Sequence, residues 1–106
     1  MTRAVFYSRE NLLTGFLVEG HCTAHSSDET GRMVCTAVSS AAYMATNTLT
    51  EIVGAEAQIQ VEDGYMKCVI TSDPLPCQMI LQGFLLHMRQ LAAQYKQQIE
   101  VHTEVR

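Results

Sequence analysis

Alternating apolar and polar residues predict β-strands in five short segments of the chain. These segments are Thr2–Tyr7, Leu13–Glu19, Ala57–Glu62, Tyr65–Thr71 and Ile99–Val105. The third and fourth are joined by Asp63-Gly64, a pair typical of a two-residue hairpin turn because glycine accepts a positive φ. The pattern therefore predicts two strands near the start, a hairpin in the second half and a strand at the end.

Apolar residues spaced at three and four predict two helices, Val34–Val53 and about Pro76–Lys96. Gly54 stands where glycine commonly ends a helix, and the prolines of residues 72–76 break the chain before the second helix. The first helix has a face of small and apolar residues: Val38, Ala41, Ala42, Ala45, Leu49 and Ile52. The order β-β-loop-α-β-β-α-β predicts an α+β fold in a single domain, residues 1–106, with two helices packed on a mixed sheet of about four to five strands.

Composition and charge argue against two classes of protein, those that bind nucleic acids directly and those that span a membrane. The 106 residues carry a net charge of −4 without a basic run, which argues against direct nucleic-acid binding. No apolar run approaches the roughly 18 residues of a membrane span, and the start of the chain lacks an apolar leader segment. We therefore expect a cytoplasmic protein without a membrane partner, whose cysteines are reduced. The four cysteines are Cys22, Cys35, Cys68 and Cys77.

His21 and Cys35 are the strongest candidates for chemistry. His21 follows the end of a predicted strand, and Cys35 lies at the start of the predicted first helix. A polar stretch, Cys22–Gly31, connects them. Unpaired N–H groups and the positive dipole end of a helix favour a thiolate, and a histidine within reach can accept the thiol proton. This combination is typical of a thiol nucleophile with a general base.

A structural zinc site is the alternative chemistry for the same region. His21, Cys22, His25 and Cys35 are all of zinc-ligand type, and His21 and His25 have a ligand-like spacing. Adjacent ligands such as His21 and Cys22 are awkward for one tetrahedral ion, and no Cys-x-x-Cys pair accompanies them. We therefore predict neither a metal nor another cofactor, and zinc stays the weaker alternative.

Several of these residues also resemble a known family. Gly20-His21, the run Val34–Ser39, and the later Asn47, Leu49, Glu51 and Gly54 resemble the ribosomal-processing cysteine protease Prp family of bacteria. The resemblance extends to Asp63-Gly64-Tyr65 and to the C-terminal helix, so it covers nearly the whole chain.

The resemblance implies a cysteine endopeptidase with Cys35 as nucleophile and His21 as general base. It also implies the substrate, which is the N-terminal extension of large-subunit ribosomal protein twenty-seven, removed after a phenylalanine. Arg32 stands where the family has an aspartate, three residues before the cysteine, and the interval from His21 to Cys35 is longer than usual. This departure leaves a second hypothesis, a relative that binds peptides or ribosomal partners without cleaving them.

Seven further residues are candidates for supporting roles. Gly20 and Gly31 flank the connection and could act as hinges, and Arg32 could stabilise a thiolate at Cys35. Asp28 or Glu29 could replace the family aspartate. Backbone N–H groups around Cys35 and Thr36 could bind an oxyanion. The Ser39 hydroxyl could either bond to the carbonyl four residues earlier or orient the imidazole or the substrate.

The second helix suggests a homodimer. Its core stripe comprises Ile80, Leu81, Phe84, Leu85, Met88, Leu91, Ala92 and Tyr95. Met79 and Leu86 fall on the opposite face, with Gly83 between them, which favours contact with a partner helix. The family resemblance implies a dimer as well. Cys68 and Cys77, in a strand and at this helix start, are expected to be inert core residues.

Overall fold

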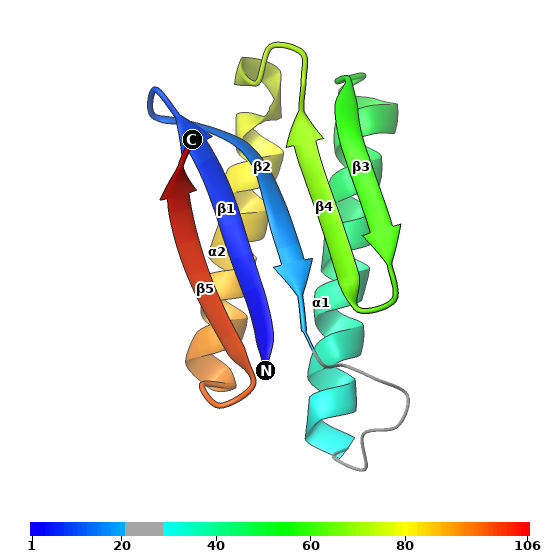
Figure 1. Ribbon diagram of the computed structural model, residues 1–106, viewed down its shortest axis with the longest axis vertical. Coiled ribbons are helices and arrows are strands. Elements are labelled where there is room, and N and C mark those ends of the chain that lie inside the picture. Colours follow the sequence, from blue (N-terminus) through cyan, green and yellow to red (C-terminus); the bar gives the residue numbers. More distant parts are fainter. Residues whose placement is uncertain (21–28) are drawn as a thin grey trace.

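The computed structural model describes residues 1–20 and 29–106 and has the predicted α+β order. Its elements are β1 (Thr2–Arg9), β2 (Leu12–Glu19), α1 (Glu29–Asn47), β3 (Ala57–Glu62), β4 (Tyr65–Ile70), α2 (Gln78–Gln94) and β5 (Ile99–Val105). A π-helical turn, Thr48–Ile52, extends α1, and a 3-10 turn, Leu75–Cys77, precedes α2. The strands form one sheet in the order β3-β4-β2-β1-β5, and both helices cover the same face of it (Figure 1).

The sheet is mixed because its last strand pairs differently from the others. β1 with β2, β2 with β4, and β3 with β4 are antiparallel, whereas β5 lies parallel to β1. Glu10 and Asn11 join β1 to β2 with φ of 53° and 68°, the twist that suits a two-residue hairpin. At the predicted Asp63-Gly64 turn, Gly64 has a φ of 71°. The hairpin prediction is confirmed.

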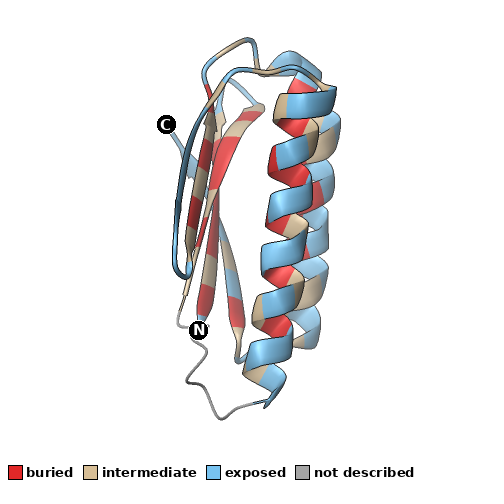
Figure 2. Cartoon of the chain, turned by 90° about the vertical axis from the view of Figure 1, so that its right-hand side faces the viewer, coloured by how far each residue is buried: buried red, intermediate tan, exposed pale blue. Residues whose placement is uncertain are grey.

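The core lies between the covered face of the sheet and the two helices (Figure 2). Phe6, Phe16 and Phe84 meet there, with ring centroids 4.8 to 6.1 Å apart. Ala42 and Ala45 of α1 are fully buried, so the small-residue face packs on the sheet as predicted. Ile52 was wrongly assigned to this face, because it is 79% exposed. The wide π-helical turn changes the helical phase and turns its side chain outward.

Both helices begin elsewhere than the sequence pattern indicates. α1 begins at Glu29 rather than Val34, so Glu29, Thr30 and Gly31 are helical instead of belonging to the polar connection. A carboxylate in the first turn favours this earlier start through the helix dipole. α2 begins at Gln78, whose side-chain amide bonds both the N–H and the carbonyl of Leu13, at 2.9 and 2.8 Å. Gln78 thereby ties the start of α2 to β2.

Within the part of the chain that the structure describes, no helix is long and apolar enough to cross a membrane.

Candidate active site

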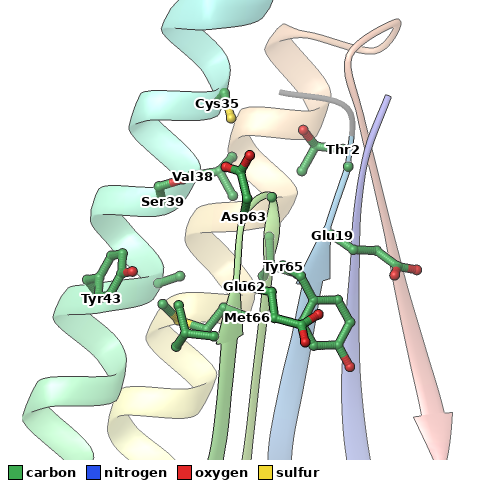
Figure 3. Close-up of a pocket in the computed structure, with 15 residues that line it drawn as sticks. Thr2, Glu19, Cys35, Val38, Ser39, Tyr43, Glu62, Asp63, Tyr65 and Met66 are labelled. Carbon is green, nitrogen blue, oxygen red and sulfur yellow. The ribbon is translucent and has the colours of Figure 1, made fainter. Parts of the chain in front are cut away.

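A pocket of about 510 Å³ opens between α1, the β3–β4 hairpin and the end of β2 (Figure 3). Cys35, Ser39 and Tyr43 line it from α1, and they follow one another at intervals of four residues, which places them on one helix face. The hairpin contributes the facing wall, including Asp63 and Gly64. The remaining lining residues are Thr2, Val18, Glu19, Gly20, Val38, Ala42, Val61, Glu62, Tyr65 and Met66.

Cys35 lies in the helix and not at its start, which corrects the prediction. It stands six residues after Glu29, the first residue of α1. Because the helix dipole acts on charges within the first turn, it does not explain an activated Cys35 thiol. The N–H groups of Cys35 and Thr36 are also too deep in the helix to be free, since only the first four lack an intrahelical partner. The predicted oxyanion donors are therefore not available in this helix.

Burial separates Cys35 from the other two cysteines that the structure describes. Cys68 and Cys77 are fully buried, as expected for core residues. Burial raises the pKa of the Cys68 thiol to about 11. Burial, and to a lesser degree the Asp73 carboxylate, raises the pKa of Cys77 as well. Cys35 is half-buried and borders the pocket, so of these three thiols it is the accessible one.

His21 lies outside the described residues, so its distance to Cys35 is not defined by the structure. The same holds for Cys22, His25 and Asp28, and hence for three of the four residues of the zinc alternative. Within residues 1–20 and 29–106, no three histidine, cysteine or acidic side chains gather as metal ligands would.

Gly20, the residue before His21, is held in a tight position. Its N–H donates to the carbonyl of Gly64 at 3.1 Å. A Cβ atom at Gly20 would lie 2.7 Å from the Thr2 Cα and 2.8 Å from the Met1 oxygen, and one at Gly64 would lie 2.9 Å from the Gly20 oxygen. Close backbone approach therefore accounts for Gly20, and the hinge role expected from the sequence stays a prediction.

Of the other supporting candidates within the described residues, the structure places only one at the pocket. Ser39 lines the pocket, and no described residue pairs with its hydroxyl. Arg32 and Thr36 are exposed on α1, and the Thr36 hydroxyl bonds back to the Arg32 carbonyl at 3.0 Å. Gly31 lies inside the first turns of α1, which does not fit a hinge in a connecting loop. Glu29 stands in the first turn and does not line the pocket.

Tyr43 and Asp63 line the pocket but were missed in the sequence. Tyr43 could have been found from its helical spacing, since it stands eight residues after Cys35 on the same face of α1. Asp63 belongs to the Asp63-Gly64-Tyr65 run of the family resemblance but was given no role, because its place beside α1 depends on the pairing of β4 with β2 and of β3 with β4.

Residues 1–100 match the sequence profile of the family described as cysteine protease Prp. The chain belongs to the Prp family. Its fold agrees with that of a Streptococcus mutans protein, SMU.848, with a TM-score of 0.87 and 24% identity over 100% of this chain and 96% of the other.

Two S. aureus structures, described as the essential ribosomal processing protease Prp with a substrate peptide and with a covalently linked product peptide, also share the fold. They give TM-scores of 0.86 and 0.84, with 17% and 18% identity over 98% of this chain and 100% of the other. No curated protein sequence matches the chain. Family membership identifies this chain as a cysteine protease, which confirms the predicted enzyme class.

Proposed function

We propose that this Prp-family chain is an endopeptidase that removes the N-terminal extension of large-subunit ribosomal protein twenty-seven, with Cys35 as nucleophile and His21 as general base. The observation that carries the proposal is the Cys35 thiol, which borders a pocket of about 510 Å³ while Cys68 and Cys77 are sealed in the core. His21 directly follows Gly20, and Gly20 lines that same pocket.

In the proposed reaction, the Cys35 sulfur attacks the scissile carbonyl carbon and the thiol proton passes to His21. The imidazolium then protonates the leaving amine as the C–N bond breaks, which leaves the N-terminal fragment as a thioester on Cys35. Water, deprotonated by His21, hydrolyses this thioester and returns the thiol. Ser39 is proposed to support the site by orienting the bound peptide, since its hydroxyl lines the pocket.

The substrate is proposed from the family and is compatible with the charge of the chain. The S. aureus Prp that shares this fold is described as a ribosomal processing protease and was crystallised with a substrate peptide. This chain carries a net charge of −4, and ribosomal proteins that bind RNA are commonly basic. Opposite net charges speed the encounter of enzyme and substrate and contribute specificity.

We further propose a homodimer that forms through α2 and works in the cytoplasm. Met79 is 87% exposed and Leu86 is 57% exposed on this helix, as the sequence pattern predicted for a partner-facing side. Between them, a Cβ at Gly83 would meet no atom within 4 Å, so the surface there is open to a second helix. Light scattering at micromolar concentration should give twice the monomer mass, and a monomeric mass would refute the dimer.

The functional proposal is tested by incubating wild-type, Cys35→Ala and His21→Ala proteins with a peptide that spans the extension junction. Mass spectrometry should find one cut with wild-type protein and none with either variant, while the Cys35→Ala protein still binds the peptide. Binding by wild-type protein without any Cys35-dependent cut over many hours would contradict the protease assignment. It would favour the second hypothesis, a peptide-binding relative without activity.

A further inference from the structure

Three acidic residues, Glu19, Glu62 and Asp63, border the pocket, but they do not all face Cys35. Glu62 pairs with Tyr65 and Tyr65 with Glu19 across neighbouring strands, so their side chains share one face of the sheet. Strand alternation places that face opposite the core side, where Met66 and Val18 point. The Glu19 carboxylate is bonded to Arg3 there, at 3.0 Å.

Asp63 differs from these two residues because it lies in the turn, where strand alternation ends. Its carboxylate points from the hairpin tip toward the Cys35 side of the pocket (Figure 3). No described residue forms a hydrogen bond or an ion pair with this carboxylate. The described residues that line the pocket include no lysine, arginine or histidine. The Cys35 side of the pocket thus presents one anionic group without a cation from the described wall.

The position of Asp63 is fixed by its neighbour. Gly64 adopts a φ of 71° and its carbonyl accepts the Gly20 N–H at 3.1 Å, which ties the hairpin tip to the end of β2. A turn that is held in this way fixes the backbone of Asp63 relative to α1, while its exposed carboxylate can still change rotamer. A fixed backbone loses less conformational freedom on binding than a mobile loop does, which helps a residue on it to discriminate between ligands.

We propose that Asp63 is a specificity residue that binds a lysine or arginine side chain of the peptide near the scissile bond, at a position other than the phenylalanine before that bond. This inference rests on the proposed function, because the peptide must present its scissile carbonyl to Cys35. With that carbonyl at Cys35, the side chain of a flanking residue extends toward the opposite pocket wall, where Asp63 lies. A charge-assisted hydrogen bond between the two then favours a cationic residue over a neutral one of similar length.

Binding to the Cys35→Ala protein tests the proposal without requiring turnover. The probes are fluorescent peptides that span the extension junction and keep the phenylalanine before the scissile bond. At each of the other positions near that bond in turn, they carry lysine or the neutral isostere norleucine. We expect one position at which lysine binds about tenfold more tightly than norleucine. The further change Asp63→Asn should remove this preference and leave the affinity for the norleucine peptide within about twofold.

Glu62→Gln is the matched control, because it makes the same change of charge one residue away, on the other face of the sheet. It should retain most of the lysine preference, and raised salt should weaken the preference in every protein that has it. The reverse design is Asp63→Lys, which should shift the preference toward a glutamate peptide at the same position.

Three results would overturn the proposal. They are the absence of a lysine preference at every position, an equal loss of affinity for lysine and norleucine peptides on Asp63→Asn, and an equal effect of Glu62→Gln. The proposed function fails separately. If the Asp63-dependent preference is present but wild-type protein cuts none of the peptides, Asp63 stands as a residue that selects the bound peptide, and the protease proposal does not stand.

Discussion

The closed core and the pocket share the same helix, α1, and lie against different faces of it. On one face, Val34, Ala42 and Ala45 are buried against the sheet. On the neighbouring face, Cys35, Ser39 and Tyr43 border the pocket. The contrast between Cys35 and Cys68 follows from this difference, since burial raises the pKa of Cys68 to about 11. Packing, more than residue type, therefore decides which thiol can react.

The largest expected effect is a loss of stability caused by a substitution in the core. Phe16 is fully buried and its ring packs on Phe84, with centroids 4.8 Å apart. Phe16→Ala should lower the free energy of unfolding by about 3–5 kcal/mol, because it removes apolar contacts and leaves a cavity. Ser39→Ala in the pocket should change it by less than about 0.5 kcal/mol. Urea denaturation measures both, and equal losses would contradict the division into core and pocket.

The next largest effect on stability is expected from replacing Gly20 and Gly83 with alanine. A Cβ at Gly20 would meet backbone atoms of Thr2 and Met1, so Gly20→Ala should cost about 1–3 kcal/mol through forced backbone shifts. In the middle of α2, a Cβ at Gly83 would meet nothing within 4 Å in the single chain, so Gly83→Ala should stabilise the monomer by up to about 1 kcal/mol. Thermal unfolding at one protein concentration, low enough to keep the protein monomeric, compares the two. At higher concentration, a destabilising Gly83→Ala would show that this face is occupied, as the proposed dimer requires.

Thiol alkylation directly compares the accessibility of Cys35 with that of the two buried cysteines. In a Cys22→Ser background, iodoacetamide near pH 7.5 should label Cys35 first, since Cys68 and Cys77 are buried and the pKa of each is raised. Peptide mapping of partly labelled protein identifies the site. Simultaneous labelling of Cys35 and Cys68 in the folded protein would contradict the burial difference.

The same burial predicts how stability depends on pH. The folded protein holds the Cys68 proton more tightly than the unfolded chain, whose thiols have a pKa near the ordinary 9.0. The contribution of Cys68 is therefore complete below about pH 9 and is lost as pH rises toward about 11. Cys68→Ala should flatten the loss of unfolding free energy between these pH values, which urea denaturation at successive pH values measures.

The smallest effect is expected at Arg32. It is exposed on α1 and is not among the residues that line the pocket. Arg32→Asp, which restores the family residue, should therefore change kcat/KM by less than about fivefold, the equivalent of about 1 kcal/mol for an exposed charge. A loss well beyond that would assign Arg32 a direct part in stabilising the thiolate.

How much the sequence could predict depends on whether a feature is local. The Asp63-Gly64 hairpin and the strand Ile99–Val105 were predicted at their observed positions because alternation and turn residues lie within each segment. The start of α1 was missed because Glu29, Thr30 and Gly31 are polar or small and resemble a loop. Ile52 was placed wrongly because a π-helical turn changes the phase without a signal in the pattern.

The candidate site also contains some residues that the sequence could indicate and others that only the fold brings together. Cys35, Ser39 and Gly20 could be proposed from residue type and family resemblance, and the structure places all three on one pocket. Arg32 and Thr36 were also proposed because they are close in sequence to Cys35, yet the structure leaves them outside the pocket lining. The hairpin wall with Asp63 depends on pairing between strands far apart in the chain, which no local pattern encodes.

The central claim is that the Cys35 sulfur forms a covalent bond with the substrate. Wild-type protein is incubated with the junction peptide, quenched in acid at successive times and weighed intact by mass spectrometry. The account predicts a transient adduct with the mass of the N-terminal fragment minus water, which peptide mapping locates at Cys35 and which is absent from Cys35→Ala. Cleavage at an undiminished rate by Cys35→Ala, with no adduct on any protein, would contradict it.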